Sequence, residues 1–500
     1  MRRRRTVVAV LLLLPHHAPA FGPLRATAPR RRVTAPRRRV TAPRSEPTAT
    51  RRQPGPLRAT TAESFVSERA PALLVDIVKH RTELGTTMKR QNARTGGSAV
   101  VEDVTLDALD AWGLRLTCNV KRRLGFGMGR GFETTQEPAN ATWAELMPGE
   151  APGAAGAALD GATAQRRFMQ IACGLGLAGD AARLLDASFP GGFGDAGRLP
   201  DDMWLNNIPA SPLARQHMAD ASIRAILDAL ADPAAPPTLA LTVKPPELDP
   251  EMDTYRIGTL LELVRAIAFR VIDETGKRVR ICVQGPMGEG IFAGLPLSLN
   301  GVRKLLQLMD WGSQGEELMA DDYVRFGAVG AADVDEKDDV FIILAPQSIV
   351  GNSIVPLLEE MVEAAAGRPI ITINGRLDDV QSAAGVMSYR GRGDRLDFVD
   401  AWKEIFHFSL IVPTGRTFYP ILGAVCMPLL GAPYALYQRL ELCTEKDRRF
   451  ANSVERAAAA RAGELSETYR PIGCFAEFPT GKEQKLAFRE AAKLVMEGIY

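Results

Sequence analysis

The sequence is poor in the side chains that most enzymes use for acid–base and nucleophilic chemistry. Only five of its 500 residues are histidines, and two of these lie in the first 20 residues. His217 falls in an amphipathic helical pattern and His407 in an apolar run, so we interpret both as packed or hydrogen-bonded side chains. The patterns GxSxG and HExxH are absent, and the carboxylates show no metal-ligand spacing. We therefore expect no catalytic residue, no bound metal and no cofactor.

Cysteine is scarce and unpatterned. The six cysteines are scattered over residues 118–474 without a CxxC pair, which argues against a disulfide framework and against a zinc site. Cys282 and Cys426 lie inside apolar runs, which favours buried free thiols over a redox pair.

Uncharged apolar stretches are short. One such stretch beyond the N-terminus, Ile421–Leu436, contains Pro428 and Pro433 and is shorter than the ~20 residues that a membrane-spanning helix needs. We expect this stretch to pack in the core or to form a hairpin that lies on the surface.

The first 62 residues have the composition of a targeting segment. Arg2–Arg5 form a basic start, Val7–Leu14 an apolar core too short to span a bilayer, and Ala18–Ala20 a small-residue cleavage site. These features predict a signal peptide over about residues 1–20. Residues 21–62 are rich in Arg, Thr, Pro and Ala and repeat TAPR and GPLRAT, which is typical of an organelle transit peptide.

This two-part address resembles the presequences of algae whose plastids lie inside extra membranes, in which Phe often follows the signal cleavage site. Phe21 occupies that position. The resemblance implies a chloroplast of the secondary type, with the protein in the stroma or on the stromal face of the thylakoid. The alternative is a disordered basic arm that binds nucleic acid or membrane, but a cleavable apolar core has no use on such an arm.

The charge balance depends on this segment. Residues 1–62 hold 15 Arg and one acidic residue, so the net charge falls from +2 for the whole chain to −12 for the remainder, with 46 basic and 58 acidic side chains. Nucleic-acid partners require basic patches, so an acidic mature chain is not expected to bind them.

Residues 63–208 form a poorly patterned N-terminal region. We expect one amphipathic helix over Ala62–Leu84, a linker over Pro148–Ala162 and a helix over Gln165–Phe189. The segment Gly125–Phe132 (GFGMGRGF) looks like a phosphate loop, but no helix start follows it, which favours a flexible loop.

The clearest structural signal runs from Asp338 to Arg376. Apolar runs at Val340–Leu344 and Pro369–Ile373 flank a segment, residues 354–365, whose apolar side chains recur at helical spacing. Strands that lack alternation are buried on both faces, as in a parallel sheet covered by helices. The segment is therefore a strand–helix–strand unit with a right-handed crossover.

Residues 209–500 continue this alternation as one α/β domain. A rigid loop, KPPELDPEMD, follows the first strand. We expect a three-layer fold, a mostly parallel sheet flanked by helices, preceded by a disordered N-terminal targeting segment. The further strands are expected at Thr238–Val243, Val279–Val283, Tyr323–Val329, Phe406–Val412 and Ala435–Arg439, and the further helices at Ser211–Leu230, Tyr255–Glu274, Asn300–Asp310, 451–463 and 483–497.

Polar loops follow three of the expected strands, after Val283, Leu344 and Ile373. In open α/β sheets, ligands lie beyond the carboxyl ends of the strands, where amide and hydroxyl groups can bind a polar molecule. Glycine-rich loops, Asn-Gly turns and Ser or Asn caps also serve strand-to-helix geometry alone, so both interpretations stay open. The candidate ligand-binding residues at this edge are Gln284, Gln347, Ser348, Asn352, Asn374 and Arg376.

A second candidate is the basic segment Tyr389–Arg395 (YRGRGDR). Arg390 and Arg392 lie just before an expected helix and could clamp an anion. A solvated turn paired with nearby acids explains the same residues equally well.

The ordered sequence blocks of the α/β region resemble a known family. The blocks are KPPELDPEMDTYRIGTLLELVR, QGPMGEGIFAGLPLSLNGVRKLLQLMDWG, RFGAVG, DDVFIILAPQSIVG, RPIITINGRLDDV and MSYRGRGDRLDF, and they cover roughly Pro209–Arg439. They resemble plastid and cyanobacterial proteins grouped as domain-of-unknown-function family nineteen ninety-five.

The resemblance implies a chloroplast auxiliary protein that assists photosystem II assembly by binding photosystem II subunits or assembly factors, with peripheral association with the thylakoid. It implies protein binding rather than catalysis, and it supplies no established catalytic residues. The alternative is a plastid enzyme or a metabolite- or nucleotide-binding protein that uses the polar loops at the carboxyl edge of the sheet.

Overall fold

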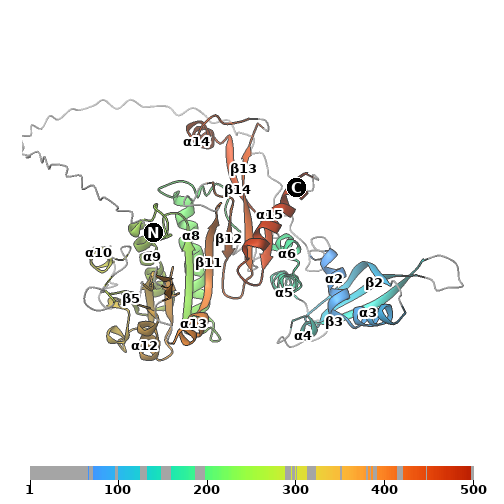
Figure 1. Ribbon diagram of the computed structural model, residues 1–500, viewed down its shortest axis with the longest axis horizontal. Helices are drawn as coiled ribbons and strands as arrows, with labels where there is room; N and C mark the ends of the chain where they lie inside the picture. The colour runs from blue at the N-terminus through green and yellow to red at the C-terminus, as the bar shows by residue number, and fades with distance from the viewer. Residues whose placement is uncertain are drawn as a thin grey trace, which may run out of the picture. The chain divides into compact units, whose positions relative to one another are not determined.

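The structure is a computed structural model of the whole chain (Figure 1). It describes residues 66, 71–95, 99–123, 132–147, 159–185, 198–287, 294, 299, 301–311, 323–349, 352–378, 381–382, 385–386, 391–413, 420–445 and 448–496. The targeting segment, the glycine-rich segment 124–131, most of the expected linker and Arg390 lie outside these residues.

A small α+β unit occupies the first part of the described chain. Two helices pack against a three-stranded antiparallel meander in the order β1-β2-β3 (Figure 1). Leu74 and Ile77 on the first helix and Leu114 and Leu116 on the middle strand are almost completely buried. The elements are α2 (Pro71–Arg81), α3 (Glu83–Thr95), β1 (Val100–Leu109), β2 (Gly113–Arg123), β3 (Phe132–Thr142) and α4 (Trp143–Leu146).

The helix expected over Gln165–Phe189 is two helices, α5 (Gly161–Gly174) and α6 (Ala178–Leu185). Asp160 caps the first by accepting a hydrogen bond from the backbone N–H of Thr163. The chain turns at Gly176, where φ is +74°. Glycine adopts such a φ without steric cost, which explains why the helical periodicity is interrupted here.

The α/β region is built on a nine-stranded sheet in the order β14-β13-β12-β11-β4-β8-β7-β5-β6. The pairs from β11 to β6 are parallel, and the pairs from β14 to β11 are antiparallel. The expected α/β fold with a mostly parallel sheet is therefore confirmed. The strands are β4 (Thr238–Lys244), β5 (Val279–Val283), β6 (Val324–Ala328), β7 (Val340–Leu344), β8 (Ile370–Ile373), β11 (Lys403–Ile411), β12 (Gly423–Met427), β13 (Tyr434–Cys443) and β14 (Leu465–Phe475), and a separate ribbon is formed by β9 (Gln381–Ser382) and β10 (Gly385–Val386).

Helices cover both faces of the parallel part. Ile281 and Ile342 belong to the core under α8 and α9, whereas Phe341 and Ile343 belong to a second core under α12 and α13. All residues of β5, β7 and β8 are buried, as their unbroken apolar runs predict. The helices are α8 (Pro212–Ala231), α9 (Ile257–Thr275), α10 (Val302–Leu308), η3 (Ala331–Asp333), α12 (Val355–Ala365) and α13 (Arg392–Asp400).

The antiparallel part carries its own helices, α14 (Ser453–Arg461) and α15 (Gly481–Met496), which contact β14 (Figure 1). The uncharged stretch Ile421–Leu436 supplies β12 and the start of β13, a buried hairpin of the sheet, so the expectation of core packing is confirmed. Within the part of the chain that the structure describes, no helix has the length and apolar character needed to cross a membrane.

Candidate functional site

The three polar loops expected to share one sheet edge do so, because β5, β7 and β8 are parallel neighbours. The chain leaves β5 toward β6 and leaves β7 toward β8, in opposite directions along the sheet. This divergence makes the β5–β7 edge a switch point of the topology, where α/β sheets commonly bind ligands.

Gln284 joins the two loops at this switch point. Its side chain is buried, donates to the backbone oxygen of Gln347 at 2.9 Å and accepts from the backbone N–H of Gln347 at 2.9 Å. Both ends of the Gln284 amide are thus engaged in holding the loop after β7.

Ser348 and Asn352 shape the same loop. The buried Ser348 hydroxyl donates to the backbone oxygen of Leu377 at 3.2 Å and accepts from the backbone N–H of Ile354 at 3.3 Å, at the start of α12. Asn352 exchanges two backbone hydrogen bonds with Ile349. These contacts close the connection from β7 to α12.

Asn374 connects the end of β8 to the loop that follows β4. Its side chain is 1% exposed, donates to the backbone oxygens of Val243 at 2.8 Å and Leu248 at 3.0 Å, and accepts from the backbone N–H of Val243 at 2.6 Å. Its φ of +52° is one that asparagine tolerates better than most residues. Asn374 therefore holds the end of β4 by two hydrogen bonds and the loop KPPELDPEMD by one.

The two arginine candidates that the structure describes lie apart. Arg376, after β8, forms an ion pair with Glu251 of the KPPELDPEMD loop, with 2.6 Å between Nη2 and Oε1. Both side chains are about half exposed. Arg392 opens α13, and Arg390 lies outside the described residues. Five of the candidates, Gln284, Gln347, Ser348, Asn374 and Arg376, thus gather at one edge, where the hydrogen bonds of Gln284, Ser348 and Asn374 brace loops.

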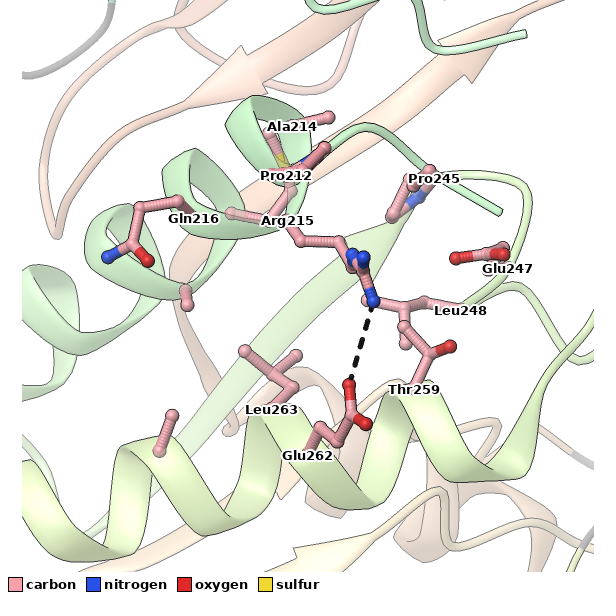
Figure 2. A pocket seen from close by; sticks show the side chains of 14 residues that line it. Pro212, Ala214, Arg215, Gln216, Pro245, Glu247, Leu248, Thr259, Glu262 and Leu263 are labelled. Carbon is pink, nitrogen blue, oxygen red and sulfur yellow. Dashed lines mark ion pairs between the residues drawn. The ribbon is translucent and has the colours of Figure 1, made fainter. Parts of the chain in front are cut away.

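The loop braced by Asn374 forms one wall of a cavity of about 330 Å³ (Figure 2). The other walls are the first turns of α8 and of α9. Within the KPPELDPEMD loop, the backbone N–H of Leu248 donates to the backbone oxygen of Pro245, and the backbone N–H of Arg256 donates to that of Glu247. The apolar and small lining residues are Ala210, Pro212, Ala214, Met218, Ala219, Pro245, Leu248, Leu263 and Ala266.

The polar atoms of the cavity are few, and one of them is exceptional. Glu247 is only 3% exposed, and its Oε2 has no hydrogen-bond partner among the residues that the structure describes. Figure 2 shows its carboxylate at the cavity wall, opposite the α8 residues Arg215 and Gln216. A buried carboxylate without a full set of partners is costly for the fold, so such groups mark candidate binding sites.

An ion pair lies at the opening of the cavity. Nη1 of Arg215 on α8 lies 3.9 Å from Oε2 of Glu262 on α9, and the two side chains are 44% and 69% exposed (Figure 2). A pair this long and this exposed contributes little stability and can separate easily. The cavity therefore has an apolar interior, a buried acidic group and a charged rim.

The sequence did not reveal this cavity. The helix expected from Ser211 is capped by that residue, whose hydroxyl accepts from the backbone N–H of Ala214 at 3.1 Å and donates to the backbone oxygen of Met203 at 2.8 Å. The one available signal was Glu247 between two prolines and a leucine, an acidic residue in a loop too rigid to turn it toward water.

A second polar group lies on β11. Glu404 accepts from Tyr434 and Thr242, each at 2.5 Å, and its Oε1 lies 2.9 Å from Nδ1 of His407. Nε2 of His407 lies 2.8 Å from the Ser409 hydroxyl. Burial raises the pKa of Glu404, but the hydrogen bonds from His407, Thr242 and Tyr434 outweigh it and lower that pKa overall. His407 is a hydrogen-bonded histidine, as expected.

The family comparison covers the elements that build the cavity. Residues 212–456 match the family model described as Domain of unknown function (DUF1995). The match supports the resemblance of this segment to that family. The match begins at Pro212, the first residue of α8, and extends into α14. The braced sheet edge, Glu404 of β11 and all residues that line the cavity except Ala210 lie within the matched segment.

Proposed function

We propose that this protein is a nucleus-encoded chloroplast auxiliary protein that assists photosystem II assembly by binding a partner polypeptide. The proposal draws on the sequence blocks from KPPELDPEMD to RPIITINGR, which resemble the chloroplast protein called Low PSII Accumulation three. The two-part N-terminal address supports the same location by an independent argument, in the stroma or on the stromal face of the thylakoid.

The observation that carries the binding role is the apolar cavity with its incompletely partnered Glu247 carboxylate. Binding energy comes from burying apolar surface and from satisfying a buried polar group, and this cavity offers both. A binding protein of this kind needs no assembled nucleophile or metal.

Depletion of the protein in its source organism tests this role. We expect the amount of assembled photosystem II to fall while photosystem I stays near its normal level, and re-expression of the full chain to restore photosystem II. An equal loss of both photosystems, or no loss of either, would contradict the proposal.

The second candidate is a metabolite- or nucleotide-binding protein, which the location of Gln284 and Gln347 at the β5–β7 switch point favours. A thermal-shift screen with nucleotides and sugar phosphates distinguishes the two candidates, because a ligand that binds only the folded state raises the melting temperature. A saturable rise with one of these compounds would favour the second candidate.

A further inference from the structure

We infer that the cavity between α8, α9 and the Pro245–Glu251 loop receives an apolar segment of a partner polypeptide that carries one Lys or Arg side chain. The inference rests on the proposed role in binding a partner and names the chemistry that the partner must supply. The cationic group would pair with Glu247, and the apolar neighbours would fill the space around Met218 and Leu263.

The first argument is the state of Glu247. Its backbone oxygen accepts from the backbone N–H of Arg256 at 2.8 Å, and the backbone oxygen of the next residue, Leu248, accepts from Asn374, so the backbone that carries this side chain is held in place. Its Oε2 lacks a partner among the described residues, although the group is almost fully buried. A protonated amine or guanidinium satisfies such a carboxylate best, since a hydrogen bond between opposite charges is about twice as strong as a neutral one.

The second argument is the composition of the walls. They are lined by Pro, Ala, Met and Leu side chains on two helices and a loop, so the occupant must be mostly apolar. Lys and Arg combine an aliphatic stem with a charged end, and a stem of this kind can cross the apolar part of the cavity while its end reaches Glu247.

The third argument is the rim. Glu262 is exposed at the opening and engages Arg215 only at 3.9 Å. Two acidic groups, one inside and one at the edge, face a single arginine, so the local charge is complementary to a cation.

Peptide binding to the purified full chain tests the inference. The probe is a fluorescein-labelled, amidated peptide of Leu and Ala with one central Lys, and fluorescence anisotropy measures its dissociation constant. A matched peptide with Met in place of Lys keeps the size and the apolar character but removes the charge. We expect the Lys peptide to bind at least about tenfold more tightly than the Met peptide.

Two variants with the same change of charge locate the contact. Glu247→Gln should weaken binding of the Lys peptide at least about tenfold, because it removes the buried carboxylate. Glu262→Gln, at the exposed rim, should change binding by less than about threefold. Glu247→Gln should also raise the melting temperature of the free protein, because an unpaired buried carboxylate destabilises the fold. Such a rise would show at the same time that the variant folds.

Three results would overturn the inference: equal binding of the Lys and Met peptides, no effect of Glu247→Gln, or binding of n-octylammonium as tight as that of the peptide. The last would assign the cavity to a free amphiphilic amine. Loss of photosystem II on depletion would still support the assembly role in all three cases, so the two proposals fail separately.

Discussion

Single buried polar side chains determine the geometry of the sheet edge. The side chain of Asn374 holds backbone atoms of Val243 and Leu248, and the side chain of Gln284 holds backbone atoms of Gln347. Such residues look like ligand-binding groups in the sequence, since the same amides that bind a ligand can bind a loop. The effect of Asn374 on the cavity is indirect and passes through the loop that carries Glu247.

The first prediction concerns Asn374. Asn374→Ala removes three hydrogen bonds to buried backbone groups and should lower the free energy of unfolding by about 3 kcal/mol. Asn374→Asp should also destabilise at neutral pH, because a carboxylate oxygen would then face the carbonyls of Val243 and Leu248.

Urea denaturation at several pH values checks this prediction. The folded state should raise the pKa of the new Asp, so the stability of Asn374→Asp should be greatest below the pKa of the unfolded chain and should fall as the pH rises through the folded value. A variant whose stability relative to wild type does not change with pH would show that the amide does not donate to these carbonyls.

The second prediction concerns His217 on α8. Burial lowers its pKa to about 4, with Asp220 opposing and Arg224 reinforcing the shift. The unfolded chain binds a proton near pH 6.5 and the folded chain does not, so stability should fall as the pH drops from about 6.5 to about 4, by up to about 3 kcal/mol. Urea titrations of wild type and His217→Gln should diverge in this range, and parallel curves would contradict the assignment.

At the scale of elements, the sequence predicts the buried parallel strands well and the exposed antiparallel ones poorly. Unbroken apolar runs such as Val340–Leu344 require burial on both faces, and they mark β5, β7 and β8 correctly. β3 has an almost entirely exposed first half and contains Pro138, so it reads as a loop. Proline is tolerated there because β3 is an edge strand of its sheet.

The cavity could not be predicted because it depends on how elements distant in sequence meet. The helical patterns of α8 and α9 and the cap at Ser211 are visible in the sequence, but the space between the helices is not. The loop that closes one side of this space is held by a hydrogen bond from Asn374, 126 residues later in the chain. Pairings of this range leave no local sequence pattern.

The third prediction tests a connection between elements. Glu467 of β14 is fully buried, accepts from Arg439 of β13 and from Tyr469 at 2.6 Å each, and its backbone exchanges hydrogen bonds with Asp202. Glu467→Ala should lower the free energy of unfolding by about 3–5 kcal/mol, since it leaves a largely buried arginine without its main partner.

Glu441→Ala is the matched control for this prediction, because Glu441 also pairs with Arg439, at 2.8 Å, but is 19% exposed. In denaturant unfolding, Glu441→Ala should lower the free energy of unfolding clearly less than Glu467→Ala does. Equal losses for the two variants would mean that Arg439 does not depend on the buried carboxylate.

At the scale of the whole molecule, the segment that matches the DUF1995 model combines a sheet edge braced by hydrogen bonds with a cavity whose buried acid lacks a full set of partners. This combination is what a binding protein requires, because a preorganised site loses little conformational entropy on binding. The net charge of −12 beyond residue 62 fits a partner with basic segments.

The most direct test of the account is a mild-detergent pull-down of the tagged protein from plastids, carried out in parallel for wild type, Glu247→Gln and Glu262→Gln. We expect wild type and Glu262→Gln to recover photosystem II core subunits or their assembly intermediates, and Glu247→Gln to recover much less. Recovery of no photosystem II protein by the wild-type chain, with all three proteins found alone in the soluble fraction, would contradict the account.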